Sequence, residues 1–165
     1  MPAETADLTE LRETFEALTG RFAGDVVAGA VDHGELTARL SKDVVASVLR
    51  FFKDERGFNA FEDLIVFDNL DDPDNGGGRF TVVYRLYKFP GAVRARLAVK
   101  IGEGESLPSA VPVYASADWA EREAFDMFGV RFDGHPNLRR IYLPDDFEGH
   151  PLRKDFPLAG RTGGR

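Results

Sequence analysis

The sequence predicts an α+β fold, in which a two-layer domain with a mixed sheet is followed by a helix and an extended C-terminal arm. In two stretches before residue 60, apolar residues recur every three or four positions, as in amphipathic helices. In five shorter stretches they cluster or alternate with polar residues, as in strands. After Gly129 neither period continues. We therefore expect an α+β domain over residues 1–104, and a helix with an extended arm over residues 105–165.

The first helix is expected to begin near Leu8. Its apolar stripe consists of Leu8, Leu11, Phe15, Leu18 and Phe22. Asp7 and Glu10 resemble a capping box, in which two side chains satisfy free N–H groups at a helix start. Because glycine commonly ends helices, we expect this one to end near Gly20 or Gly24.

A β-hairpin should follow the first helix. Residues 26–31 and 36–40 are rich in strand-favouring residues, and the three-residue link 32–34 joins them. Gly34 favours a tight turn there, because glycine adopts a positive φ at no steric cost. His33 lies in this turn and is expected to face solvent.

A second helix and three further strands complete the first domain. Ser41 is a candidate helix cap, an apolar stripe runs over residues 44–52, and Gly57 should end the helix. The three strands are expected at residues 64–67, 80–86 and 93–101, with a polar loop at 71–78 between the first two. The last two strands alternate apolar with polar residues, so we predict an antiparallel pair with one wet face.

A third helix is predicted over residues 117–128, capped by Ser116 or Asp118 and ended by Gly129. Four prolines beyond Gly129 oppose regular structure in the segment that follows. About 30 irregular residues are unusual inside a compact domain, and this segment has too many apolar residues for a disordered tail. We therefore interpret it as an arm that lies on another protein. Its apolar anchors are Phe132, Leu138, Ile141, Tyr142, Leu143, Phe147, Leu152 and Phe156.

Composition excludes several classes of function. The chain has 165 residues, a formal net charge of −7 and no cysteine. Disulfides, a thiolate nucleophile and cysteine-ligated iron–sulfur clusters on this chain are therefore excluded. The negative charge argues against nucleic acid or an anionic membrane surface as a partner. No apolar run approaches the roughly 20 residues of a membrane helix, so we expect a soluble cytoplasmic protein without direct membrane insertion.

An acidic cluster on the third helix is the main candidate for catalysis. Glu121, Glu123 and Asp126 lie there with Arg122, and Arg122 and Asp126 are spaced to pair at i, i+4. A paired-carboxylate site needs two acids that converge on a substrate cleft, which one helix cannot establish. We favour structural ion pairs, with a small hydrolase as the rival hypothesis.

His135 and His150 are the candidate metal ligands. Acidic residues lie between them, and imidazole with carboxylate suits zinc. However, each histidine precedes a proline in a Gly-His-Pro step, and their spacing is not that of two ligands on one helix. A rigid turn with a backbone-bonded imidazole is the simpler interpretation.

Motifs in the last third of the chain resemble a known family. They are Glu121-Arg122-Glu123, Asp126-Met127-Phe128-Gly129, the two Gly-His-Pro steps, Leu138-Arg139-Arg140, and Leu152-Arg153-Lys154-Asp155-Phe156-Pro157. Together they closely resemble the C subunit of NADH:quinone oxidoreductase, respiratory complex I. The order of elements before residue 105 also agrees with that family.

The resemblance implies a non-redox subunit in the peripheral arm of a proton-translocating complex. Such a subunit would scaffold the quinone-reducing module by packing on the homologue of the D subunit, at the cytoplasmic face of the cell membrane. Iron–sulfur clusters, FMN and quinone would belong to partner subunits, and no catalytic residue is expected on this chain. The implied partner-binding residues are Trp119, Glu121, Arg122, Glu123, Asp126, Phe128, His135, Arg139, Arg140, His150, Arg153, Lys154 and Asp155.

The same motifs leave the electron donor open. Related ferredoxin-driven, deazaflavin-linked and hydrogenase-linked complexes use a similar subunit, and the residues do not separate these assemblies.

Overall fold

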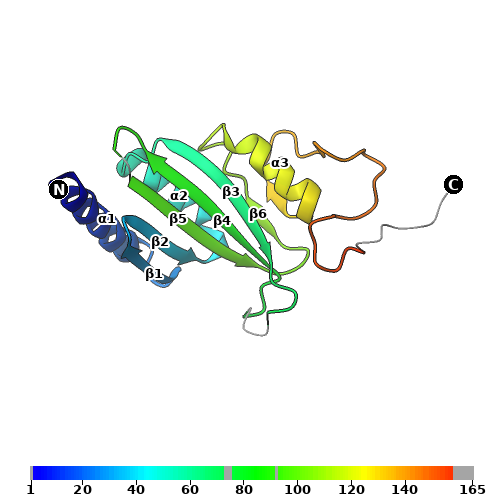
Figure 1. Ribbon diagram of the computed structural model, residues 1–165, viewed down its shortest axis with the longest axis horizontal. Coiled ribbons are helices and arrows are strands. Elements are labelled where there is room, and N and C mark those ends of the chain that lie inside the picture. Colours follow the sequence, from blue (N-terminus) through cyan, green and yellow to red (C-terminus); the bar gives the residue numbers. More distant parts are fainter. Residues whose placement is uncertain (1, 73–75, 92, 158–165) are drawn as a thin grey trace.

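The computed structural model describes residues 2–72, 76–91 and 93–157, and it confirms the α+β class with a mixed five-stranded sheet (Figure 1). The sheet has the strand order β1-β2-β5-β4-β3. The helices are α1 (Pro2–Arg21), α2 (Val45–Arg50) and α3 (Ala117–Phe128). The strands are β1 (Val26–Asp32), β2 (Glu35–Leu40), β3 (Ala60–Asp68), β4 (Phe80–Lys88), β5 (Val93–Ile101), β6 (Ser106–Pro108) and β7 (Arg131–Asp133).

The pairing of β2 with β5 makes the sheet mixed. These two strands run parallel, while β1–β2, β5–β4 and β4–β3 are antiparallel. The hairpin between β1 and β2 is confirmed, but its turn has two residues rather than three. His33 and Gly34 both have positive φ, 49° and 76°, as a type I′ turn requires. The His33 side chain is exposed, as expected.

Helices cover one face of the sheet. In Figure 1 α2 lies behind the sheet and α3 lies beside β3, while α1 packs against β1 and β2. Inward-facing residues of the strands and the buried faces of these helices form one hydrophobic core. Its fully buried members include Leu11, Leu18, Leu36, Leu49, Phe52, Tyr84, Leu86 and Leu97.

The two N-terminal helices differ in detail from the prediction. Helix α1 begins at Pro2, so Asp7 lies inside it and the predicted capping-box start is wrong. The second helix is composite: a 3₁₀ turn over Lys42–Val44 precedes α2, and a π-helical turn over Phe51–Glu55 follows it. Ser41 occupies the cap position but makes no side-chain cap hydrogen bond. Phe51 and Phe52, the first two residues of the π turn, are both buried in the core.

Three strands depart from the prediction. Strand β3 spans nine residues rather than four, and its Phe67 is exposed because it lies on the face of the sheet opposite the core, where it pairs with Thr81. Strands β6 and β7 are absent from the prediction, and they pair in parallel as a separate two-stranded sheet. Three residues are too few for an alternating pattern to be recognised. Of the predicted loop over residues 71–78, positions 73–75 lie outside the described residues.

The hydrophobic core continues across the expected domain boundary at residue 104. Leu107, Tyr114, Val130 and Phe132 are buried in the same cluster as the sheet residues. Helix α3 spans Ala117–Phe128, and Gly129, with a φ of 76°, follows its last residue. Ser116 lies at the N-cap position but makes no side-chain cap hydrogen bond. The predicted bounds of this helix are therefore confirmed, and independent folding of residues 1–104 stays a prediction.

Candidate functional site

Asp126, on α3, organises the chain segment that follows the helix. Its carboxylate accepts hydrogen bonds from the backbone N–H groups of Ile141, Tyr142 and Leu143, at 3.0, 2.8 and 3.1 Å. It also forms a 2.6 Å ion pair with Arg140. Burial alone would raise the pKa of Asp126, but these hydrogen bonds lower the pKa below its ordinary value. In a helix or a strand these three N–H groups would donate to backbone carbonyl oxygens; here they donate to the Asp126 carboxylate instead.

Arg122, one turn before Asp126 on the same face of α3, attaches the same segment. Its guanidinium donates to the carbonyl oxygens of Arg139 and Arg140, both at 3.1 Å, and lies 4.0 Å from Asp118. The predicted pairing of Arg122 with Asp126 is therefore wrong. Asp126 pairs with Arg140 instead, because the arm returns over α3 and brings that guanidinium to the carboxylate.

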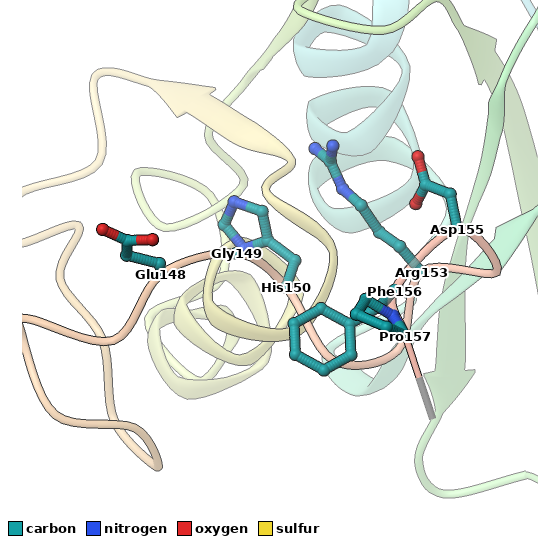
Figure 2. A pocket seen from close by; sticks show the side chains of 7 residues that line it. All are labelled: Glu148, Gly149, His150, Arg153, Asp155, Phe156 and Pro157. Atoms are coloured by element: carbon teal, nitrogen blue, oxygen red, sulfur yellow. The ribbon is translucent and has the colours of Figure 1, made fainter. Parts of the chain in front are cut away.

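His150 and Arg153 fix the arm to the C-terminal end of α3. Nδ1 of His150 lies 2.9 Å from the carbonyl oxygen of Asp126, and Nε of Arg153 donates to the carbonyl oxygen of Phe128 at 2.6 Å. Burial lowers the pKa of His150, so its ring is neutral near pH 7. Both side chains extend in the same direction from the arm and line a pocket of about 180 Å³ beside Phe156 (Figure 2).

Arg79 makes a second attachment that no sequence pattern indicates. Its guanidinium lies 3.3 Å from Asp68, 2.7 Å from Glu103 and 2.7 Å from Asp155. The backbone N–H of Lys154 also donates to Asp68, at 2.9 Å. These residues come from segments that are distant in the sequence, so no local spacing could have indicated the cluster.

Glu121 is buried between α3 and the segment before it. Its carboxylate accepts hydrogen bonds from the Ser109 hydroxyl at 2.6 Å and from the backbone N–H of Ala110 at 2.5 Å. Nε2 of His135 lies 3.9 Å from the carboxylate. Burial raises the pKa of Glu121 to about 7, although the two hydrogen bonds act in the opposite direction.

Of the acids and histidines singled out from the sequence, Glu121 and His135 lie near each other, while Asp126 and His150 lie elsewhere along α3 and the arm. Among the described residues, no group of three or more His, Cys, Asp and Glu side chains could hold a metal ion. His135 and His150 contact different backbone carbonyls, those of Asp118 and Asp126, which agrees with the backbone-bonded interpretation. Across the described part of the chain, no helix is long and apolar enough to cross a membrane.

Exposed apolar side chains lie around the outer side of α3. Trp119 is 66% exposed, Tyr142 64% and Leu152 54%. The Arg122 guanidinium stacks on the Trp119 ring at 5.3 Å, and the Tyr142 hydroxyl lies 3.4 Å from Glu123. We call Trp119, Glu123, Tyr142 and Leu152 the α3 surface.

A groove of about 280 Å³ extends the α3 surface toward the sheet. Leu152, Phe128 and Ala124 line one side of it, and residues of β3 line the other. Phe128 is half-buried and packs edge-on against Phe80 at 6.4 Å.

The predicted partner-binding residues thus separate into two groups. Most contact their own chain: Glu121, Arg122, Asp126, Phe128, His135, Arg140, His150, Arg153 and Asp155. Trp119, Glu123, Arg139 and Lys154 are exposed, as is Asp155 of the first group. Glu123 and Lys154 each also contact a side chain of their own chain. Tyr142 and Leu152 belong to the predicted anchors of the arm, although they are not among the predicted contact residues. Leu158, beyond the last anchor of the arm, lies outside the described residues.

Comparison with known proteins decides the family. Residues 38–162 match the family described as "Respiratory-chain NADH dehydrogenase, 30 Kd subunit". The chain belongs to this family. Its relatives include the C subunit of the NADH-quinone oxidoreductase of Trichlorobacter lovleyi, which is 39% identical over 93% of each chain. The corresponding C subunit of Citrifermentans bemidjiense is 42% identical over 87% of each chain.

Two solved structures share the fold of this chain. The trypsin-resistant fragment 1–134 of Nqo5 superposes with a TM-score of 0.65 at 30% identity, over 76% of this chain and 99% of that one. A chain of the archaeal membrane-bound sulfane sulfur reductase superposes with a TM-score of 0.74 at 25% identity, over 89% of this chain and 85% of that one. This chain is therefore a peripheral component of respiratory complex I, and other subunits of that complex are its partners.

Proposed function

We propose that this subunit is a non-redox scaffold that docks on the homologue of the D subunit through the α3 surface and supports the quinone-reducing module. The observation that carries the proposal is the exposure of Trp119 and Tyr142 on a segment that is otherwise fixed to its own chain. Exposed aromatic residues beside an arginine are typical centres of protein interfaces.

The attachment of the arm to α3 supports this role. Because Asp126, Arg122 and Arg153 hold the arm before any partner arrives, little conformational entropy is lost when the partner binds. In this interpretation the charged motifs shape the surface, while Trp119, Tyr142 and Leu152 contact the partner. That division of roles revises the expectation that the buried motif residues themselves bind the partner.

The proposal includes the remaining expectations about the complex. Iron–sulfur clusters, FMN and quinone are bound by partner subunits, and this chain contributes no catalytic residue to a proton-translocating enzyme at the cytoplasmic face of the membrane. The absence of cysteine supports this assignment for cysteine-ligated clusters only. The intact complex, purified and supplied with NADH or with reduced ferredoxin, distinguishes an NADH-driven complex from the related assemblies.

The docking proposal is tested by removing the two exposed rings. The double variant Trp119→Ala/Tyr142→Ala is co-expressed with the homologue of the D subunit, and the amount that co-purifies is measured. We expect a decrease of roughly tenfold or more, since aromatic hot spots contribute about 2 kcal/mol or more each. Phe89→Ala is the matched control, because Phe89 is also 66% exposed but lies beyond β4, away from α3. Equal recovery of both variants would contradict docking through this surface.

A further inference from the structure

The five-stranded sheet has a second face that no helix covers in the described part of the chain. This face is turned to the viewer in Figure 1, with α2 behind the sheet. Side chains alternate along β4 and β5, so Val83 and Arg85 on β4 share this face with Arg94 and Arg96 on β5. We call this side the outer sheet face.

Arginine dominates the outer sheet face. The ion pairs there are Arg96–Glu35 at 2.6 Å, Arg85–Glu62 at 3.1 Å and Arg94–Glu62 at 3.7 Å. Two carboxylates are thus shared among three guanidinium groups. The strand registers place further charges on this face, namely Arg39, Lys100, Asp63 and Asp32. Among the described residues of the sheet, five cations therefore share this face with four carboxylates, which is an excess of one positive charge on a chain whose formal net charge is −7.

Two polar atoms near this face have no hydrogen-bond partner among the described residues, and an apolar pocket opens beside them. Nε of Arg85 and Oε1 of Glu35 are buried atoms without a hydrogen-bond partner among the described residues. Between the arginines, Ile65, Phe67 and Val83 line a pocket of about 350 Å³. Arginine beside an apolar pocket is the composition of interface centres rather than of an ordinary wet sheet face.

We propose that the outer sheet face docks an acidic segment of a neighbouring subunit of the complex. Carboxylates of that segment accept hydrogen bonds from Arg85, Arg94 and Arg96, and an apolar side chain enters the pocket beside Val83. The positive excess selects an acidic partner, since like charges across an interface are unfavourable. This contact is separate from the α3 surface, and it does not depend on which protein that surface binds.

Site-specific photo-crosslinking tests which molecule covers the face. A photoreactive phenylalanine analogue replaces Val83, the intact complex is assembled in cells and purified, and crosslinked peptides are identified by mass spectrometry. We expect crosslinks to one acidic segment of another subunit. Crosslinks to lipid, crosslinks to a second copy of this chain, or an absence of protein crosslinks would each overturn the proposal.

Charge reversal tests the role of the arginines. Arg94→Glu/Arg96→Glu is compared with Arg12→Glu/Arg50→Glu, which changes the net charge equally on the exposed sides of α1 and α2. The fraction of the chain found in the assembled complex should fall roughly tenfold only for the outer-face variant. If that variant proves unfolded by circular dichroism, Arg94→Gln/Arg96→Gln replaces it, with a smaller decrease expected. Assembly of the Arg94/Arg96 variant equal to that of the control would refute docking at the outer sheet face. If only the Trp119/Tyr142 variant lost binding, docking through the α3 surface would stand and docking at the outer sheet face would be refuted.

Discussion

Asp126 is the residue on which the arm most depends, because its buried carboxylate serves one guanidinium and three backbone N–H groups. Asp126→Asn replaces an accepting oxygen with an amide that donates, so at least one buried N–H group loses its partner. We expect a loss of about 2–3 kcal/mol in the free energy of unfolding, measured by urea denaturation. Asp118→Asn, which affects only a partly exposed carboxylate 4.0 Å from Arg122, should change stability by less than about 1 kcal/mol. Similar values for both variants would argue against this role.

Glu121 gives the stability of the chain a specific pH dependence. Burial raises its pKa from 4.5 to about 7, so the folded state binds a proton more tightly than the unfolded state. The stability that this provides is present below pH 4.5 and is lost as the pH rises through 7. Relative to Glu121→Gln, the wild-type chain should lose up to about 3 kcal/mol across that range, as measured by denaturant unfolding at a series of pH values. Glu123→Gln, at an exposed position, should leave the pH profile unchanged.

At the scale of elements, Gly129 joins α3 to the arm, and its substitution should disturb both. Its φ is +76°, and a Cβ there would lie 2.5 Å from Nη2 of Arg153 and 2.6 Å from Nε2 of His150. Gly34 has the same φ with nothing within 4 Å, so Gly34→Ala isolates the backbone contribution. We expect about 1 kcal/mol of destabilisation for Gly34→Ala, and at least about 1 kcal/mol more for Gly129→Ala. Thermal unfolding measures both, and equal losses would show that Arg153 and His150 move aside freely.

The elements also show which parts of the structure the sequence could predict. Strands β4 and β5 are long enough for the alternation of apolar and polar residues to be recognised. Helix α3 is marked in the sequence by the glycine that follows it, Gly129. Strands β6 and β7 depend on each other across an intervening helix, and three residues carry no readable period. The site follows the same division. Asp126 and Arg140 stand out in the sequence, but their bond depends on the path of the arm. Arg79 and Asp155 are 76 positions apart, so only the tertiary fold brings them together.

At the scale of the whole molecule, Arg79 links the sheet to the end of the described arm. Arg79→Ala would leave Asp68, Glu103 and Asp155 close together without their shared cation. We expect a loss of about 2–4 kcal/mol in unfolding free energy and faster protease cleavage near residues 150–157. Limited proteolysis followed by mass spectrometry measures the cleavage. Arg21→Ala, which removes an exposed pair with Glu55, should cost less than about 1 kcal/mol and leave cleavage unchanged. Unaltered cleavage in Arg79→Ala would show that the α3 contacts alone hold the arm.

The parallel pairing of β2 with β5 has a consequence for biosynthesis. Strand β2 ends at Leu40, but its partner is complete only at Ile101, so a β1–β2 hairpin that leaves the ribosome lacks the partner that its β2 edge has in the folded sheet. Until β5 emerges, that edge can pair with strands of other nascent chains. The sheet closes when β5 inserts between β2 and β4, after which only β1 and β3 remain as edges. Slow translation between residues 40 and 101 would therefore lengthen the period in which the nascent chain can aggregate.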